Sequence, residues 1–236
     1  HGSEKHYYDC ELVQIRQLLE RKDLNEMASF FGNAKLIVLD EAQKVDDIGV
    51  ILKILHDHLP KMQIIATGSS SFVLSNRLQE PLTGRGIEFT LYPFSLREQA
   101  YGKNKIECEA LLKETLIYGS YPEIFLSGVA EKKLLLDNLA NKYLFNDLFE
   151  LERIKRPDVL AKLLQLLAFQ IGNEVSRNEL STNLGVNRDT IDRYLHLLES
   201  AFIIFRVKSL SRNLRKELTK KEKYYFYDLG IRNSII

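Results

Sequence analysis

Two adjacent carboxylates, Asp40 and Glu41, are the residues of this sequence best placed to do chemistry. They follow residues 36–39, Leu-Ile-Val-Leu, and four consecutive aliphatic residues predict a strand buried on both faces of a parallel sheet. The C-terminal end of such a strand is where α/β sheets bind ligands. In a nucleotide hydrolase, Asp40 would hold Mg²⁺ through water and Glu41 would accept a proton from the attacking water. The alternative is a solvated strand end before a helix N-terminus, where the helix dipole favours acids.

Hydroxyl groups follow a second apolar segment at residues 63–66, Gln-Ile-Ile-Ala. Thr67 and Ser69 could bind nucleotide at this neighbouring strand end, and Ser69 could contact a γ-phosphate or orient the water. The alternative is that Ser70 or Ser71 caps the next helix. Arg85 lies between two glycines and could stabilise the charge that builds in a phosphoryl-transfer transition state. An arginine in such a loop is more often only a surface residue.

The spacing of apolar residues predicts the elements that position these groups. Over the first 95 residues strands and helices alternate, which is typical of a layered α/β domain. The predicted strands are 7–15, 35–40, 63–67 and 86–93, and the predicted helices are 16–32, 48–59 and 72–78. Helical spacing then dominates, at 96–101, 107–118, 131–149, 159–171, 177–184 and 187–201, before two strands at 202–209 and 223–228.

The C-terminal third has the pattern of a winged helix-turn-helix. Ser176 and Glu179 fit a capping box at a helix start, Gly185 lies in a turn, and Asn187 fits the cap of the next helix. The candidate nucleic-acid contacts are the polar and basic residues of this second helix and of the wing: Arg188, Thr190, Arg193, Arg212, Arg215 and Lys216. Such a patch attracts phosphates without reading sequence. The alternatives are a lid over the nucleotide or a protein-docking module.

Composition narrows the classes of protein. The chain has 236 residues, with 33 Lys and Arg against 32 Asp and Glu, so a protein that coats nucleic acid uniformly is disfavoured. Cys10 and Cys108 are far apart and form no disulfide framework or metal spacing, which favours the reducing cytoplasm. No apolar run approaches the roughly 20 residues that span a bilayer. We therefore expect a cytoplasmic protein without a membrane segment.

Six short segments, taken together and in order, resemble a large family of prokaryotic predicted ATPases. Residues 36–43 resemble a Walker B motif and residues 65–72 resemble the sensor strand that follows it. The match continues with residues 82–85, 91–95, 118–122 and 223–230. In that family an AAA-like domain precedes a winged helix and a C-terminal domain of unknown function, often compared with restriction endonucleases. The resemblance covers essentially the whole chain and implies an ATP-hydrolysing switch of the AAA+/STAND type that uses ATP and Mg²⁺.

The chain departs from that family at its start. No Gly-x-x-x-x-Gly-Lys-Ser/Thr loop occurs in the sequence, although family members carry it upstream of the residue equivalent to Tyr7. We therefore expect weak or no ATP binding by this chain as it stands. The strand before that loop is also missing, and it would lie beside the strand at residues 64–67. Its absence predicts unpaired strand edges and self-association, or a partner chain that fills the gap.

These observations predict an incomplete parallel P-loop NTPase sheet with helices, then an α-helical segment and a winged helix-turn-helix. The predicted boundaries are 1–3 for a tag remnant, 4–95 for the ATPase core, 96–156 for a helical lid or linker, 157–230 for the winged helix and 231–236 for the start of a further domain. Three functions stay open: an ATP-hydrolysing switch, a module that binds double-stranded DNA on an ATPase scaffold, and a protein-docking component of a toxin-like or defence system.

Overall fold

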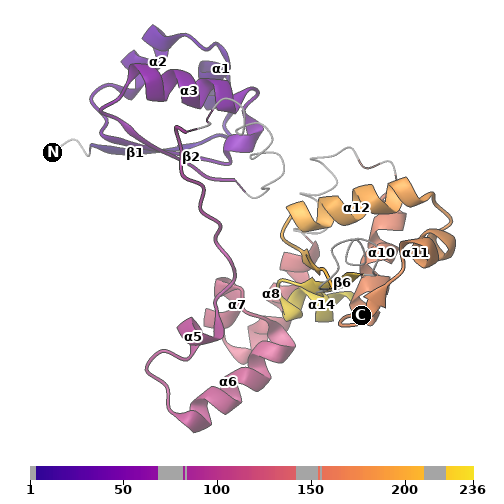
Figure 1. Cartoon of the computed structure of the whole chain (residues 1–236). Helices are drawn as coiled ribbons and strands as arrows, with labels where there is room; N and C mark the ends of the chain where they lie inside the picture. Colours follow the sequence, from indigo (N-terminus) through magenta and orange to yellow (C-terminus); the bar gives the residue numbers. More distant parts are fainter. Residues whose placement is uncertain (1–3, 69–81, 83, 142–153, 155, 210–221) are drawn as a thin grey trace. The chain divides into compact units, whose positions relative to one another are not determined.

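The computed structural model describes residues 4–68, 82, 84–141, 154, 156–209 and 222–236 (Figure 1). The chain divides into two compact units, residues 1–89 and 90–236, and each has its own hydrophobic core. The predicted boundary after residue 95 therefore falls just inside the second unit. The predicted helix at 72–78 lies outside the described residues.

A parallel sheet forms the centre of the first unit. Its strands are β1 (Lys5–Asp9), β2 (Leu36–Asp40) and β3 (Gln63–Ala66), in the order β1-β2-β3. Asp9 is opposite Asp40 in the register of β1 and β2, and Leu39 is opposite Ala66 in that of β2 and β3. Because all three strands run the same way, their C-terminal ends meet at one edge of the sheet, with Asp40 on the central strand. The predicted parallel arrangement is confirmed.

Three helices, α1 (Val13–Glu20), α2 (Leu24–Phe31) and α3 (Ile48–His58), cover one face of this sheet (Figure 1). Ile37 and Leu39 point into the core beneath them and are fully buried. The single helix predicted at 16–32 is in fact two helices. Lys22 has a φ of 56°, which ends α1, and the Asp23 side chain accepts hydrogen bonds from the amides of Asn25 and Glu26 to start α2.

The prediction of a strand at residues 86–93 is wrong. The described chain from residue 84 to 95 contains no strand, and the side chains of Ile87 and Leu91 are 82% and 97% exposed. An alternating apolar pattern makes a strand only when a neighbouring strand supplies hydrogen bonds. β3 lies at the edge of the described sheet and pairs with β2.

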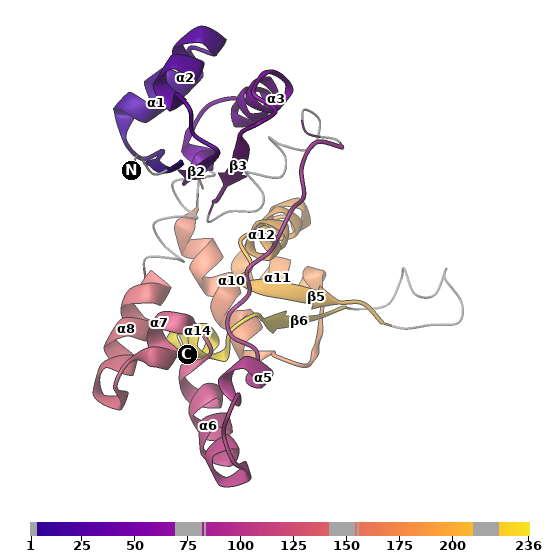
Figure 2. The ribbon, with the colours of Figure 1, turned by 90° about the vertical axis from the view of Figure 1, so that its left-hand side faces the viewer.

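The second unit combines helices with a small antiparallel sheet (Figure 2). Its first helices are α5 (Leu96–Gln99), α6 (Lys105–Tyr118), α7 (Pro122–Leu126) and α8 (Val129–Asn141). The following helices are α10 (Pro157–Phe169), α11 (Arg177–Leu184), α12 (Arg188–Ser200) and α14 (Leu229–Ile235). The sheet has the order β4-β6-β5, from β4 (Glu174–Val175), β6 (Glu222–Phe226) and β5 (Ile204–Val207). Residues 142–149 of the helix predicted at 131–149 lie outside the described residues.

The last helix, α14, contains the residues that were predicted to start a further domain, from residue 231 onward. α14 packs against α6, α8 and α10, and Ile231 is buried in the core of the second unit (Figure 2). The Asp228 carboxylate starts this helix by accepting a hydrogen bond of 3.1 Å from the Ile231 amide. A Cβ on Gly230 would lie 2.2 Å from the Tyr118 carbonyl oxygen, so only glycine allows this approach. These residues are therefore part of the second unit.

Candidate functional site

The carboxylate of Asp40 lies at the end of the central strand, between side chains from both neighbouring strands. The hydroxyl of Tyr7, from β1, donates a hydrogen bond to Asp40 Oδ2. The hydroxyl of Thr67, directly after β3, donates to Asp40 Oδ1. The sheet thus brings together two of the predicted nucleotide-binding residues, Asp40 and Thr67. It adds Tyr7, which the sequence analysis did not single out, because only the strand register shows that it reaches Asp40.

These two hydroxyl donors set the protonation of the site. The hydrogen bond from Thr67, then the one from Tyr7, lowers the pKa of the Asp40 carboxyl, against the opposing effect of burial. The same contact with Asp40 raises the pKa of the Tyr7 phenol to about 12. Asp40 is therefore an anion at neutral pH and Tyr7 is a neutral donor.

Glu41 follows in a sharp turn. It has a φ of 50°, in the left-handed region that is uncommon for a residue with a side chain, and the 3₁₀ helix η1 (Ala42–Lys44) begins after it. The amide of Ala42 donates 2.9 Å to the Thr67 carbonyl, which fixes the turn beside the end of β3. The buried Gln43 donates from Nε2 to Glu41 Oε2 at 2.6 Å. Gln43 thus orients the carboxylate that the sequence predicted as the base.

Asp9 adds a third carboxylate at this edge, since it is opposite Asp40 in the strand register. Its Oδ1 accepts a hydrogen bond of 2.7 Å from the amide of Glu11, so the side chain also shapes the turn after β1. The neighbouring Cys10 is buried, and burial first, then the charges of Asp9 and Asp40, raise the pKa of its thiol to about 11. The electrostatic character of the site is therefore acidic.

The donor set fits a hard cation better than it fits a nucleotide. Ionised carboxylate and hydroxyl oxygens are the ligands that Mg²⁺ prefers, and a magnesium ion keeps several waters when one or two carboxylates hold it. Among the described residues no group of three or more His, Cys, Asp or Glu side chains could hold a metal ion. The sequence has no Gly-x-x-x-x-Gly-Lys-Ser/Thr loop to cradle phosphates.

The predicted catalytic residue Arg85 pairs with Asp57 and not with Asp40. Arg85 donates from Nε to Asp57 Oδ1 at 3.0 Å, in the last turn of α3. α3 ends just before β3 begins, so this ion pair lies toward the edge of the sheet where the strands start. A catalytic role for Arg85 would require it to leave Asp57. Ser69 lies outside the described residues.

Three of the predicted nucleic-acid contacts, Arg188, Thr190 and Arg193, lie on α12. Arg188 is exposed and its Nε is 3.8 Å from Asp192 Oδ2, while the exposed Arg193 stacks its guanidinium over the Tyr194 ring at 5.4 Å. The Thr190 amide and hydroxyl both donate to Asn187 Oδ1, at 2.8 and 2.6 Å, so Thr190 completes the helix cap. Arg212, Arg215 and Lys216 lie outside the described residues.

A network of ion pairs between α12 and its neighbours was not predicted from the sequence. Arg177 forms ion pairs with Asp192 Oδ1, at 3.0 Å, and with Glu222. Arg206 lies 3.2 Å from Glu199 and 3.5 Å from Glu222, measured between nitrogen and oxygen. These pairs join α11, α12, β5 and β6, so they hold the two helices on the small sheet.

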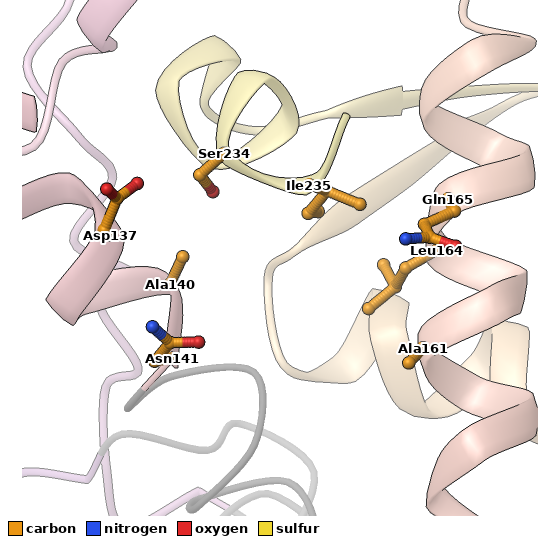
Figure 3. A pocket seen from close by; sticks show the side chains of 8 residues that line it. All are labelled: Asp137, Ala140, Asn141, Ala161, Leu164, Gln165, Ser234 and Ile235. Atoms are coloured by element: carbon orange, nitrogen blue, oxygen red, sulfur yellow. The ribbon is translucent and has the colours of Figure 1, made fainter.

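A cavity of about 390 Å³ lies between α8, α10 and α14 (Figure 3). Its lining combines apolar side chains with four polar ones and consists of Asp137, Ala140, Asn141, Ala161, Leu164, Gln165, Ser234 and Ile235. None of these residues was predicted as a site residue. Among the described residues that line the cavity, Asp137 is the only one with an ionisable side chain.

Two regions of the chain each match a known protein family. Residues 2–100 match the family of an AAA domain, and residues 109–236 match a domain of unknown function (DUF8612). An uncharacterized protein of Haemophilus influenzae is 28% identical over 232 residues, which cover 94% of this chain and 56% of that protein. An uncharacterized protein of Methanocaldococcus jannaschii is 27% identical over 222 residues, covering 87% of this chain and 50% of that protein. The chain thus spans about half the length of these relatives.

The structure is similar to a Walker-type ATPase of Pyrococcus abyssi. The TM-score is 0.58 with 17% sequence identity, and the match covers 90% of this chain and 65% of that protein. At this identity the likeness concerns the fold. Within the described residues, no helix has both the length and the apolar character needed to cross a membrane.

Proposed function

We propose that this chain, which belongs to the family of the domain of unknown function DUF8612, supplies the magnesium- and water-binding half of an ATP-hydrolysing switch. Its first 100 residues match an AAA domain, and its fold is similar to that of a P-loop ATPase. The observation that carries the proposal is Asp40, an ionised carboxylate on the central strand that accepts hydroxyl donors from both neighbouring strands. A cation and water need such a fixed acceptor at this edge of a parallel sheet.

The residues of this edge divide the chemistry among them. Asp40 would hold Mg²⁺ through water, and the ion would neutralise charge on the phosphates when it is bound. Glu41 would accept the proton of the attacking water, and the hydrogen bond from Gln43 at 2.6 Å would keep its carboxylate in one orientation. Thr67 holds Asp40 in place. Ser69 would contact the γ-phosphate and Arg85 would act as an arginine finger, as the sequence predicts.

The test is binding of magnesium-ATP by calorimetry, with this chain and with a chain extended upstream to include a phosphate-binding loop. We expect binding only by the extended chain, because the loop's amides and lysine hold the β- and γ-phosphates. In the extended chain, Asp40→Ala and Glu41→Gln should each abolish turnover, while Glu41→Gln keeps nucleotide binding. Unchanged turnover in both variants would reject the assignment.

A second candidate function is DNA binding by a winged helix in the second unit. The order α10, β4, α11, α12, β5 and β6 fits that motif, and the specific observation is that Arg188 and Arg193 are exposed on α12. Arg212, Arg215 and Lys216 would add phosphate contacts. The charge reversals Arg188→Glu and Arg193→Glu together should remove binding to a labelled duplex.

The control for this test changes the net charge equally on another surface. Lys103→Glu and Lys113→Glu, at exposed positions of the second unit, should leave DNA binding nearly unchanged. Binding by the parent should also weaken steeply with salt. Absence of any DNA affinity, with a stable complex formed by a partner protein, would instead favour the docking role in a toxin-like or defence system. We further propose that the protein works in a reducing cytoplasm, since Cys10 and Cys108 are both free thiols.

A further inference from the structure

Tyr7 occupies one of the two oxygens of the carboxylate proposed to hold the cation. Its hydroxyl donates to Asp40 Oδ2, and that of Thr67 donates to Oδ1. Both oxygens therefore already accept a hydroxyl donor. Any water brought by a cation must replace one of these donors or share an oxygen with it.

The two donors differ in how firmly the fold holds them. The Thr67 amide donates 2.9 Å to the Leu39 carbonyl, and the Thr67 carbonyl accepts 2.9 Å from the Ala42 amide, so its backbone is fixed on both sides. The Tyr7 side chain is 63% exposed, on the face of the sheet opposite the helices α1, α2 and α3. The long Tyr7 side chain can swing its phenol into solvent, whereas the Thr67 hydroxyl is carried on a short side chain whose backbone is held at the end of β3.

A magnesium-bound water and a phenol offer Asp40 the same contact. Each presents an O–H donor to a carboxylate lone pair, and each is neutral as a donor. The neighbouring Tyr8 has a different role, because its ring packs on Phe30 and Phe31 at 5.2 and 5.3 Å between centroids and its hydroxyl lies 3.0 Å from His6 Nδ1. Tyr7 is therefore the donor that a cation could displace.

We propose that Tyr7 is a placeholder: its hydroxyl takes the position of a metal-bound water on Asp40 and must leave before the cation is held there. This inference rests on the proposed function, since it concerns the same cation site. It makes Tyr7 a positioning residue that orients the Asp40 carboxylate while no cation is bound. It also predicts that Tyr7 lowers the apparent affinity of the site, because its hydrogen bond must be broken first.

The test uses Mn²⁺ as the probe in place of Mg²⁺, with the whole chain and with electron paramagnetic resonance of the free ion as the readout. Tyr7→Phe should bind Mn²⁺ about three- to tenfold more tightly than the parent, because a hydrogen bond to a charged acceptor no longer competes. Tyr8→Phe is the matched control, since it removes a hydroxyl one residue away, and it should bind as the parent does. Asp40→Asn in the Tyr7→Phe chain should remove the gain.

A second readout separates displacement from a general change in structure. Adding Mg²⁺ to the parent should change the near-ultraviolet absorption of a tyrosine as its hydroxyl leaves the carboxylate, and Tyr7→Phe should abolish this change. If Tyr7→Phe binds Mn²⁺ no more tightly than the parent while Asp40→Asn still weakens binding, the placeholder role is overturned and the cation site stands. If Asp40→Asn leaves the binding by Tyr7→Phe unchanged, the cation lies elsewhere and both proposals fail.

Discussion

Two aspartates, one in each unit, show how the same side chain serves two purposes. Asp40 accepts its hydrogen bonds from the hydroxyls of Tyr7 and Thr67 at the edge of the parallel sheet. Asp228 is 4% exposed and accepts from two backbone amides, those of Ser120 at 2.6 Å and Ile231 at 3.1 Å. The donors lower the pKa of Asp40, whereas burial raises the pKa of Asp228 in spite of its donors.

The two aspartates differ in whether their hydrogen-bond donors can be replaced by water or a ligand. Side-chain hydroxyls beside solvent can give way to waters or a ligand, so Asp40 is suited to binding. Backbone amides cannot turn away from a carboxylate without moving the chain that carries them. Asp228 therefore joins the turn after α6, at Ser120, to the start of α14, and Ser120 and Asp228 are 108 residues apart in sequence. The segments 118–122 and 223–230, both part of the family resemblance, thus meet at a structural contact. A motif residue is not by itself a site residue.

The largest effect should come from filling the space beside Asp228. A Cβ on Gly119 would lie 2.0 Å from Asp228 Oδ1, and Gly119 has a φ of 82°. Gly119→Ala should therefore lower the free energy of unfolding by about 3 kcal/mol or more, through both overlap and backbone strain. Gly102→Ala is the control, because Gly102 has a φ of 73° but open space around it, and it should cost only about 1 kcal/mol. Urea denaturation measures both, and equal losses would show that Asp228 can move.

Asp228→Asn should have a smaller effect that depends on pH. The raised pKa means that the folded chain binds this proton more tightly than the unfolded chain, so its contribution to stability is present in acid. It is lost as pH rises from about 3.9, the ordinary value, through the raised folded pKa. Asparagine offers one acceptor oxygen to two amides. The substitution should therefore lower the free energy of unfolding by about 1–2 kcal/mol near pH 4, and by less at higher pH.

Denaturation of Asp228→Asn and the parent between pH 3 and 7 checks this slope. A difference that widens as pH rises would mean that the two amide donors outweigh burial. In that case Asp228 would resemble Asp40, and the contrast between the two aspartates would fail.

Asp40→Asn should show the opposite slope. The lowered folded pKa means that the contribution of Asp40 to stability is present above its ordinary pKa of about 3.9, and it is lost as pH falls through the lowered value. The difference from the parent should stay under about 1 kcal/mol at pH 6, because the hydroxyls of Tyr7 and Thr67 can turn to water. It should vanish in acid. A difference that persists at low pH would indicate a packing role for Asp40.

The sequence predicted the fold best where apolar runs are long. Four aliphatic residues before Asp40 marked the central strand, and helical spacing marked α3, α11 and α12. The prediction failed where contacts with residues distant in sequence determine the local secondary structure. Residues 86–93 alternate, but no strand among the described residues pairs with them. Asp228, read as the end of a strand, caps the helix α14.

The candidate site was predictable only in part, for a related reason. Asp40 and Thr67 each follow an apolar strand, so their meeting could be inferred from parallel topology alone. Tyr7 lies two residues before the end of its strand and reaches Asp40 through the length of its side chain, which spacing does not show. Gln43 contacts Glu41 because a turn with positive φ folds the chain back.

The smallest effect should come from Thr67→Val, which keeps the shape of the side chain and removes its hydroxyl. Stability should change by about 1 kcal/mol or less, since the site is partly exposed to water. The pKa of Asp40 should nevertheless rise toward its ordinary value of about 3.9, because the Thr67 hydrogen bond is the largest cause that lowers it. Thr67→Ser keeps the donor and should leave the pKa lowered, as followed by the carboxyl carbon chemical shift in a pH titration. If Asp40 titrates in Thr67→Val as it does in the parent, the hydrogen bond from Tyr7 alone lowers the pKa of Asp40. No single side-chain change of this kind is available at Asp228, because its donors belong to the backbone, and that is why only Asp40 can exchange a donor for a ligand.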